Sequence, residues 1–139
     1  MANEFKELND NVIKEFRANA GKVSEPTLQA FDLLLLTTTG AKSGEKRVNP
    51  LAYAGDAGRL YVFASYAGNP KNPPWYYNLL ANPEVEVEVG NDKFNATATV
   101  VPEPERTDIY NQMASRGANF VEYQEKTDRV IPVVALNRT

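Results

Sequence analysis

The stretch Leu33-Leu34-Leu35-Leu36-Thr37-Thr38-Thr39-Gly40-Ala41-Lys42-Ser43-Gly44-Glu45-Lys46-Arg47-Val48-Asn49-Pro50 joins two apolar segments through a short polar turn. The leucines and threonines at 33–39 form an unbroken run of good strand formers, which predicts a strand buried on both faces. A second strand, at 46–54, is predicted to return from the turn. Pro50 lies inside it and cannot donate to a ladder, so this strand is predicted to have an edge or a bulge there.

The turn itself suits an anion. Gly40 and Gly44 can adopt positive φ and let neighbouring N–H groups converge, and Lys42, Lys46 and Arg47 add positive charge. An ordinary solvated hairpin loop has a similar composition. On the turn alone, both interpretations stay open.

Composition excludes several classes of function. The chain has 139 residues and a net charge of −3, which fits one globular unit and argues against general binding of nucleic acid. It has no Cys and no His, which removes thiolate nucleophiles, imidazole acid–base groups and the common metal ligands, so no metal site is predicted. An enzyme of this composition would take its reactivity from a bound organic cofactor.

The N-terminal segment predicts an amphipathic helix over about 4–19. Phe5, Leu8, Val12 and Phe16 recur at spacings of three and four, with Ile13 beside them. We expect this helix to pack on the body of the domain. The alternative is a lid or a peripheral membrane helix with its Phe side chains free. No secretory signal is evident, so we expect a cytoplasmic protein, with peripheral association with a membrane through this helix as the alternative.

The remainder of the chain predicts four more strands, joined mostly by hairpins. They are expected at 59–65, 84–89, 94–100 and 130–136, with short helices at 73–82 and 102–116 and a helical or coiled segment at 119–126. Asn72 is the expected N-cap of the first short helix, and Pro73 its first residue. Glu84, Glu86 and Glu88 alternate with valines and are expected on a solvated strand face. The predicted fold is therefore mainly β (α+β), a six-stranded antiparallel barrel. Residues 1–30 form the N-terminal helix and its connection, and 31–139 the barrel domain.

Two further features bear on a ligand. Trp75, Tyr76 and Leu79 form either a core stripe of the short helix or one wall of a cleft for a flat ring. The small residues at 64–68 end a strand and permit close approach of such a ring.

Taken together, these segments resemble the deazaflavin-dependent nitroreductase family. The resemblance lies in the blocks 34–44, 47–51, 64–68, 71–83 and 127–133, which occur in order between about Leu33 and Leu136. It implies an FMN-binding-like split β-barrel oxidoreductase that transfers a hydride from reduced coenzyme F420 to a quinone, a nitroaromatic or another conjugated acceptor. FMN is the less favoured cofactor. A non-catalytic binder of a lipid or a flavin-like ligand is the remaining alternative, and either a monomer or a homodimer is expected.

The resemblance also implies a set of site residues. Lys42 and Arg47 would bind the cofactor's phosphate and glutamyl tail, and Phe120 and Tyr123 would border the acceptor. The other implied cofactor-binding residues are Ala41, Ser43, Val48, Asn49, Pro50, Ala64, Ser65, Tyr66, Lys71, Pro74, Trp75, Tyr76 and Asn78. Ser65, Tyr66 and Tyr123 are candidates for stabilising or protonating the developing anion.

Overall fold

The computed structural model describes residues 2–19, 33–55, 59–64, 72–115, 118–127 and 130–139, without the side chains of 2–9 and 118–121. Its elements in chain order are α1 (Ala2–Ala18), β1 (Leu33–Thr39), β2 (Lys46–Gly55), β3 (Arg59–Phe63), α2 (Pro74–Ala81), β4 (Glu84–Val89), β5 (Asp92–Val100), α3 (Glu105–Ala114), α4 (Ala118–Lys126) and β6 (Val133–Arg138).

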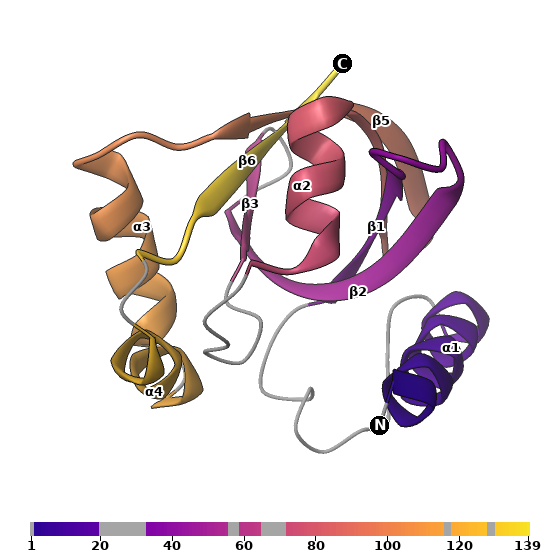
Figure 1. The fold of residues 1–139 in the computed structure, drawn as a ribbon, viewed down its shortest axis with the longest axis horizontal. Helices are drawn as coiled ribbons and strands as arrows, with labels where there is room; N and C mark the ends of the chain where they lie inside the picture. The colour runs from indigo at the N-terminus through magenta and orange to yellow at the C-terminus, as the bar shows by residue number, and fades with distance from the viewer. Residues whose placement is uncertain (1, 20–32, 56–58, 65–71, 116–117, 128–129) are drawn as a thin grey trace.

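The six strands close into an antiparallel barrel in the order β1-β2-β3-β6-β5-β4 (Figure 1). Closure leaves no strand without two neighbours, which removes the exposed edges of an open sheet. The predicted six-stranded antiparallel barrel with an N-terminal helix and short helices is confirmed.

The pairing of β2 is uneven along its length. It pairs with β1 from Lys46 to Ala52, but with β3 only at Tyr53, Ala54 and Gly55. Within the described residues, 46–52 of β2 therefore form a local edge where the barrel splits. Pro50 lies in this segment, opposite Leu35. The residues that would face it in a continuation of β3 lie outside the described residues, so the edge or bulge expected from proline stays a prediction.

Alternation along β1 explains why four successive leucines are all buried. Leu34 and Leu36 point into the barrel core, while Leu33 and Leu35 point outward and are covered by α1. Helix α2 lies across one end of the barrel (Figure 1). Its Trp75 side chain belongs to the core of the barrel. The prediction of a strand buried on both faces is confirmed.

Helix α1 packs on the outer face of β1 and β2. Val12 and Phe16 retain only 3% and 1% of their exposure, and Phe16 contacts Leu33 and Leu35. The expectation of a packed helix is confirmed for these side chains, and the alternative of free Phe side chains is wrong for Phe16. None of the described helices combines the length and apolarity needed to cross a bilayer.

One glutamate of β4 does not lie on a solvated face. The Glu88 side chain is only 14% exposed, because Arg17 of α1 covers it and donates two hydrogen bonds to its carboxylate. Glu84 is exposed and Glu86 half-buried. The prediction for Glu88 was therefore wrong, since α1 packs over the strand at that position.

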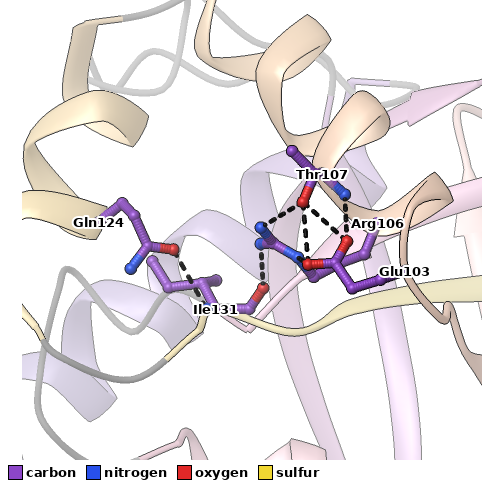
Figure 2. Close-up of polar contacts among 5 residues, drawn as sticks. All are labelled: Glu103, Arg106, Thr107, Gln124 and Ile131. Carbon is purple, nitrogen blue, oxygen red and sulfur yellow. Dashed lines mark hydrogen bonds and ion pairs between the residues drawn. The ribbon is translucent and has the colours of Figure 1, made fainter.

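A second layer, made of α3 and α4, covers the outer face of β3 and β6. Ile109, Tyr110 and Met113 of α3 pack against Phe63 and Val133. Figure 2 shows the polar contacts that hold this layer. The Arg106 guanidinium donates to the Ile131 carbonyl at 2.9 Å, and the Ile131 N–H donates to Oε1 of Gln124 at 3.2 Å.

These contacts also correct the start of the last strand. It begins at Val133 rather than at Val130, because both main-chain groups of Ile131 bond to side chains of the helices instead of to a strand. The two short helices expected at 73–82 and 102–116 also begin later in the chain than predicted. Pro73, not Asn72, is the N-cap of α2 and Pro74 its first residue, while α3 begins at Glu105.

Candidate functional site

A cleft of about 1260 Å³ runs beside the β1–β2 turn. It is bounded by the turn, the local edge of β2, one face of α1 and the N-terminal half of α2. Its lining consists of Asp10, Ile13, Arg17, Gly40, Ala41, Lys42, Ser43, Lys46, Arg47, Val48, Asn49, Asn72, Pro74, Trp75, Tyr77 and Asn78.

Four consecutive residues of β2 line this cleft, which an ordinary strand would not allow. Successive side chains of a strand point to opposite faces, so Lys46 and Val48 lie on one face and Arg47 and Asn49 on the other. Among the described residues, 46–52 pair with β1 only, and the cleft reaches both faces of this segment. Its main-chain groups on the side away from β1 have no partner strand within that part of the chain.

The turn is closed by its own backbone. The Gly40 N–H donates to the Glu45 carbonyl at 2.8 Å, and the Gly44 N–H donates to the Gly40 carbonyl at 3.0 Å. Gly44 has φ of +71°, as expected, but Gly40 does not have positive φ. Gly40 is instead crowded, since a Cβ there would lie 2.5 Å from Oγ of Ser43.

Asn78 of α2 fixes the turn to the barrel end. Its Oδ1 accepts a hydrogen bond from the Ala41 N–H at 3.0 Å, and its Nδ2 donates to the Thr38 hydroxyl at 3.3 Å. The amides of Lys42 and Ser43 have no acceptor in the described part of the chain, and both residues are exposed. The turn therefore presents N–H groups without a hydrogen-bond acceptor beside the cleft, as an anion-binding loop requires.

The cleft is locally positive although the chain is acidic. Among the described residues, its lining has four cations, Arg17, Lys42, Lys46 and Arg47, against one acid, Asp10. Arg47 pairs with Glu45 at 3.0 Å, with both side chains more than half exposed. Lys46 donates to the Thr39 hydroxyl at 3.1 Å, whereas the Lys42 ammonium has no partner among the described residues. An anionic ligand would therefore find a cation that no carboxylate already holds.

Aromatic residues of α2 form the other part of the lining. Trp75 is 5% exposed, so its ring contributes both to the barrel core and to the cleft wall. The core interpretation of Trp75 is confirmed, and the residue also lines a cleft, while its role as a wall for a flat ring stays a prediction. The neighbouring Tyr76 and Tyr77 rings meet edge to face at 5.7 Å. Burial, and to a smaller extent Tyr77, raises the pKa of Tyr76, so this phenol stays protonated at neutral pH.

Nine of the residues implied by the resemblance line this one cleft: Ala41, Lys42, Ser43, Arg47, Val48, Asn49, Pro74, Trp75 and Asn78. Pro50 lies next to them in β2, Tyr76 packs against the barrel core, and Ala64 is fully buried within that core. Ser65, Tyr66 and Lys71 lie outside the described residues. Phe120 is in α4 with an undescribed side chain, while Tyr123 packs on the cluster of α3 and β6.

The sequence did not predict that α1 forms one wall of the cleft. Asp10, Ile13 and Arg17 line the cleft at helical spacings of three and four, beside the buried row of Val12 and Phe16. That periodicity was present in the sequence. Its meaning depends on where α1 docks, which no local pattern gives. The lining residues Gly40, Lys46, Asn72 and Tyr77 were also not among the implied set.

Comparison with solved structures first gives the class of protein. A putative pyridoxamine 5'-phosphate oxidase from Listeria innocua, 16% identical, matches 76% of this chain and 82% of its own with a TM-score of 0.57, which shows the fold alone. An F420-H2 dependent reductase, FDR-A, is 40% identical over 76% of this chain and 93% of its own, with a TM-score of 0.69. A structure described as a domain-swapped dimer is 34% identical over 99% and 100%, with a TM-score of 0.71. The molecule thus belongs to the class of split-barrel reductases to which FDR-A is assigned.

The family follows from the sequence comparisons. An F420H(2)-dependent quinone reductase of Mycobacterium tuberculosis is 39% identical over 126 residues, covering 88% of this chain and 85% of the relative. The model of the F420H(2)-dependent quinone reductase family matches residues 9–138, so the chain belongs to that family. The predicted enzyme class and the cofactor, coenzyme F420, are confirmed.

Proposed function

We propose that the cleft beside the β1–β2 turn binds reduced coenzyme F420 and that a quinone accepts a hydride from it there. The observation that carries the proposal is the meeting of the cationic turn, the local edge of β2 and the Trp75 wall in one cleft. These parts match a ligand with an anionic tail at one end and a flat ring at the other.

The turn would hold the cofactor's phosphate and tail. Lys42 supplies an ammonium without a carboxylate partner in the described residues, and the Lys42 and Ser43 amides supply unbonded N–H donors. Arg47 would add a planar fork of donors that suits phosphate and carboxylate. The ion pair with Glu45 is largely exposed, so an incoming anion can share Arg47 at little cost.

The edge of β2 would hold the ring by main-chain groups. A hydrogen-bonded pair of antiparallel strands needs an N–H from both residues, and Pro50 has none. This favours a non-hydrogen-bonded pair for Leu35 and Pro50, in which main-chain groups point away from β1. Val48 is two residues away and has the same orientation. Its N–H and C=O, with the Pro50 C=O, would then be available to the polar edge of a ring.

The protein's contribution to the chemistry would be positioning. When bound, the reduced deazaflavin supplies the hydride, so no His, Cys or metal is needed from the chain. Trp75 would hold the ring against the β2 edge, keeping water from the reacting face. Tyr76 stays neutral beside this wall. Ser65 and Tyr66 remain candidate proton donors, as does Tyr123, which in this structure packs on the α3–β6 cluster.

Titration of the purified protein with oxidised coenzyme F420 and with FMN, followed by fluorescence, tests the cofactor assignment. We expect tighter binding of F420. Tighter binding of FMN would contradict the proposal and favour a flavin-binding protein. Binding of neither cofactor would also contradict it and would favour a lipid binder.

Oxidation of reduced F420 by menadione, followed by absorbance, tests the acceptor. Turnover that depends on enzyme and on quinone supports the proposal, and a nitroaromatic in a parallel assay tests the wider range of acceptors. Binding of F420 without any turnover of menadione would contradict the quinone assignment.

A further inference from the structure

Helix α1 presents Arg17 to the same cleft from outside the barrel. The buried side chains Val12 and Phe16 fix the rotation of the helix, so that Asp10, Ile13 and Arg17 face the cleft. This wall is separate from the β1–β2 turn in the sequence. The cations of the cleft therefore come from three places: the turn, the β2 edge and α1.

Arg17 is oriented by a carboxylate that does not line the cleft. Its Nε donates to Oε1 of Glu88 at 3.1 Å, and its Nη2 donates to Oε2 at 2.9 Å. The Arg17 side chain is 49% exposed, while that of Glu88 is 14% exposed. Glu88 thus binds the edge of the guanidinium formed by Nε and Nη2. The third nitrogen, Nη1, makes no hydrogen bond within the described residues.

A guanidinium held in this way can still bind an anion. Arginine has five N–H donors in a fixed plane, and Glu88 takes two of them. Three donors remain, and Arg17 is a lining residue of the cleft. Asp10 is the only acid among the described lining residues, and it is two helical turns away on the same face of α1. The ion pair removes the conformational freedom of Arg17 in advance, which lowers the cost of ordering it on a ligand.

The size of the cleft and the spread of its cations indicate the class of ligand. A volume of about 1260 Å³ exceeds the usual range of roughly 300–1,000 Å³ for small-molecule pockets. One phosphate would occupy the turn and leave α1 unused. A chain with several separate anionic groups would instead reach both.

We propose that Arg17, oriented by Glu88, is an anion-binding residue of the cleft that contacts carboxylates of an extended ligand tail beyond those bound by the turn. This assignment rests on the proposed function, since the glutamyl tail of coenzyme F420 is the chain that would supply these carboxylates. It makes α1 part of the binding site and gives the enzyme a means to distinguish cofactors by tail length.

The test compares three probes: F420 with one glutamyl residue, F420 with several, and the ribityl deazaflavin without phosphate or tail. Fluorescence titration gives the dissociation constant of each at low and moderate salt. The unsubstituted protein should bind the long tail about threefold to tenfold more tightly than the short tail. Arg17→Gln should abolish that difference and leave binding of the ribityl deazaflavin unchanged.

Two further variants separate ligand binding from a purely structural ion pair. Glu88→Gln keeps one oxygen that can accept a hydrogen bond from Arg17 but removes the charge that orients it, so the preference for the long tail should shrink yet stay larger than in Arg17→Gln. Arg59→Gln is the matched control, since Arg59 pairs with Glu105 at 3.2 Å and does not line the cleft. It should behave as the unsubstituted protein.

Three results would overturn the assignment: no tail-length preference in the unsubstituted protein, full preference in Arg17→Gln, or equal loss in Arg17→Gln and Glu88→Gln. The last would mean that the pair only docks α1. Failure of the unsubstituted protein to bind any of the three probes would instead overturn the proposed function on which the assignment rests.

Discussion

The side chain of Asn78 on α2 accepts a hydrogen bond from the Ala41 N–H at 3.0 Å, although the two residues are 37 positions apart. The same side chain donates to the Thr38 hydroxyl at 3.3 Å. One amide group thus links the helix at the barrel end, the end of β1 and the turn. This link fixes the turn against the end of the barrel.

Replacement of Asn78 with Ala should loosen the turn. Loss of these two hydrogen bonds, of which the one to Thr38 is partly buried, should lower the free energy of unfolding by about 1–2 kcal/mol and weaken cofactor binding about tenfold. The maximal rate should change little, since Asn78 would act on the turn rather than on the reacting atoms. Urea unfolding, cofactor titration and steady-state kinetics measure these effects. Leu80→Ala on the exposed face of α2 is the control, and equal losses in both variants would contradict the assigned link.

The paired substitution Lys42→Ala with Arg47→Ala removes two cations from the cleft. Cofactor binding should weaken about tenfold or more at low salt, and the loss should shrink as salt rises because exposed charges are screened. Titrations at several ionic strengths give the slope. Lys93→Ala, which removes an exposed cation paired with Glu86 outside the cleft, should leave affinity unchanged. Unaltered affinity in the paired variant would mean that the anion site lies elsewhere.

Local patterns in the sequence were sufficient for the barrel and for one wall of its cleft. The Leu33–Leu36 run and Gly44 each predicted a local backbone property that the structure has, whereas Gly40 does not have the expected positive φ. Local properties of this kind largely decide strands and turns. Burial of all four leucines was also predictable, because threonines follow without any polar alternation.

Contacts between distant segments account for what the sequence did not show. Glu88 looked solvated by its period of two, yet Arg17, 71 positions away, covers it. Ile131 looked like a strand residue, but Arg106 and Gln124 take its main-chain groups. In each case a side chain from another layer replaced water or a strand as the partner.

Phe16 connects α1 to the barrel, and its removal tests that docking. Phe16→Ala should cost about 3 kcal/mol, because a fully buried aromatic side chain leaves a cavity against Leu33 and Leu35. The loss should appear first as faster hydrogen exchange in α1 and β1, measured by mass spectrometry, and the cleft should bind its cofactor more weakly. Lys14→Ala, on the exposed side of α1, is the control. Exchange in α1 that is fast already in the unsubstituted protein would contradict the docked position.

The contacts at the start of α3 predict a specific response to acid (Figure 2). Hydrogen bonds from the Thr107 hydroxyl, with smaller contributions from the Thr107 N–H and Arg106, lower the pKa of Glu103. A carboxyl whose pKa is lower in the folded state stabilises the fold above its unfolded pKa, and that stabilisation is lost as the pH falls through the folded pKa.

Thr107→Val should therefore reduce stability at neutral pH by more than it does in acid, because the substitution removes the main cause of the lowered pKa. The urea midpoints of Thr107→Val and of the unsubstituted protein should converge between pH 7 and pH 3, because Glu103 becomes protonated in both. Thr99→Val, on an exposed position of β5, controls for the general effect of exchanging Thr for Val. A difference between the Thr107 variant and the unsubstituted protein that stays constant over this range would show that Thr107 acts on the helix through packing and not through the Glu103 carboxylate.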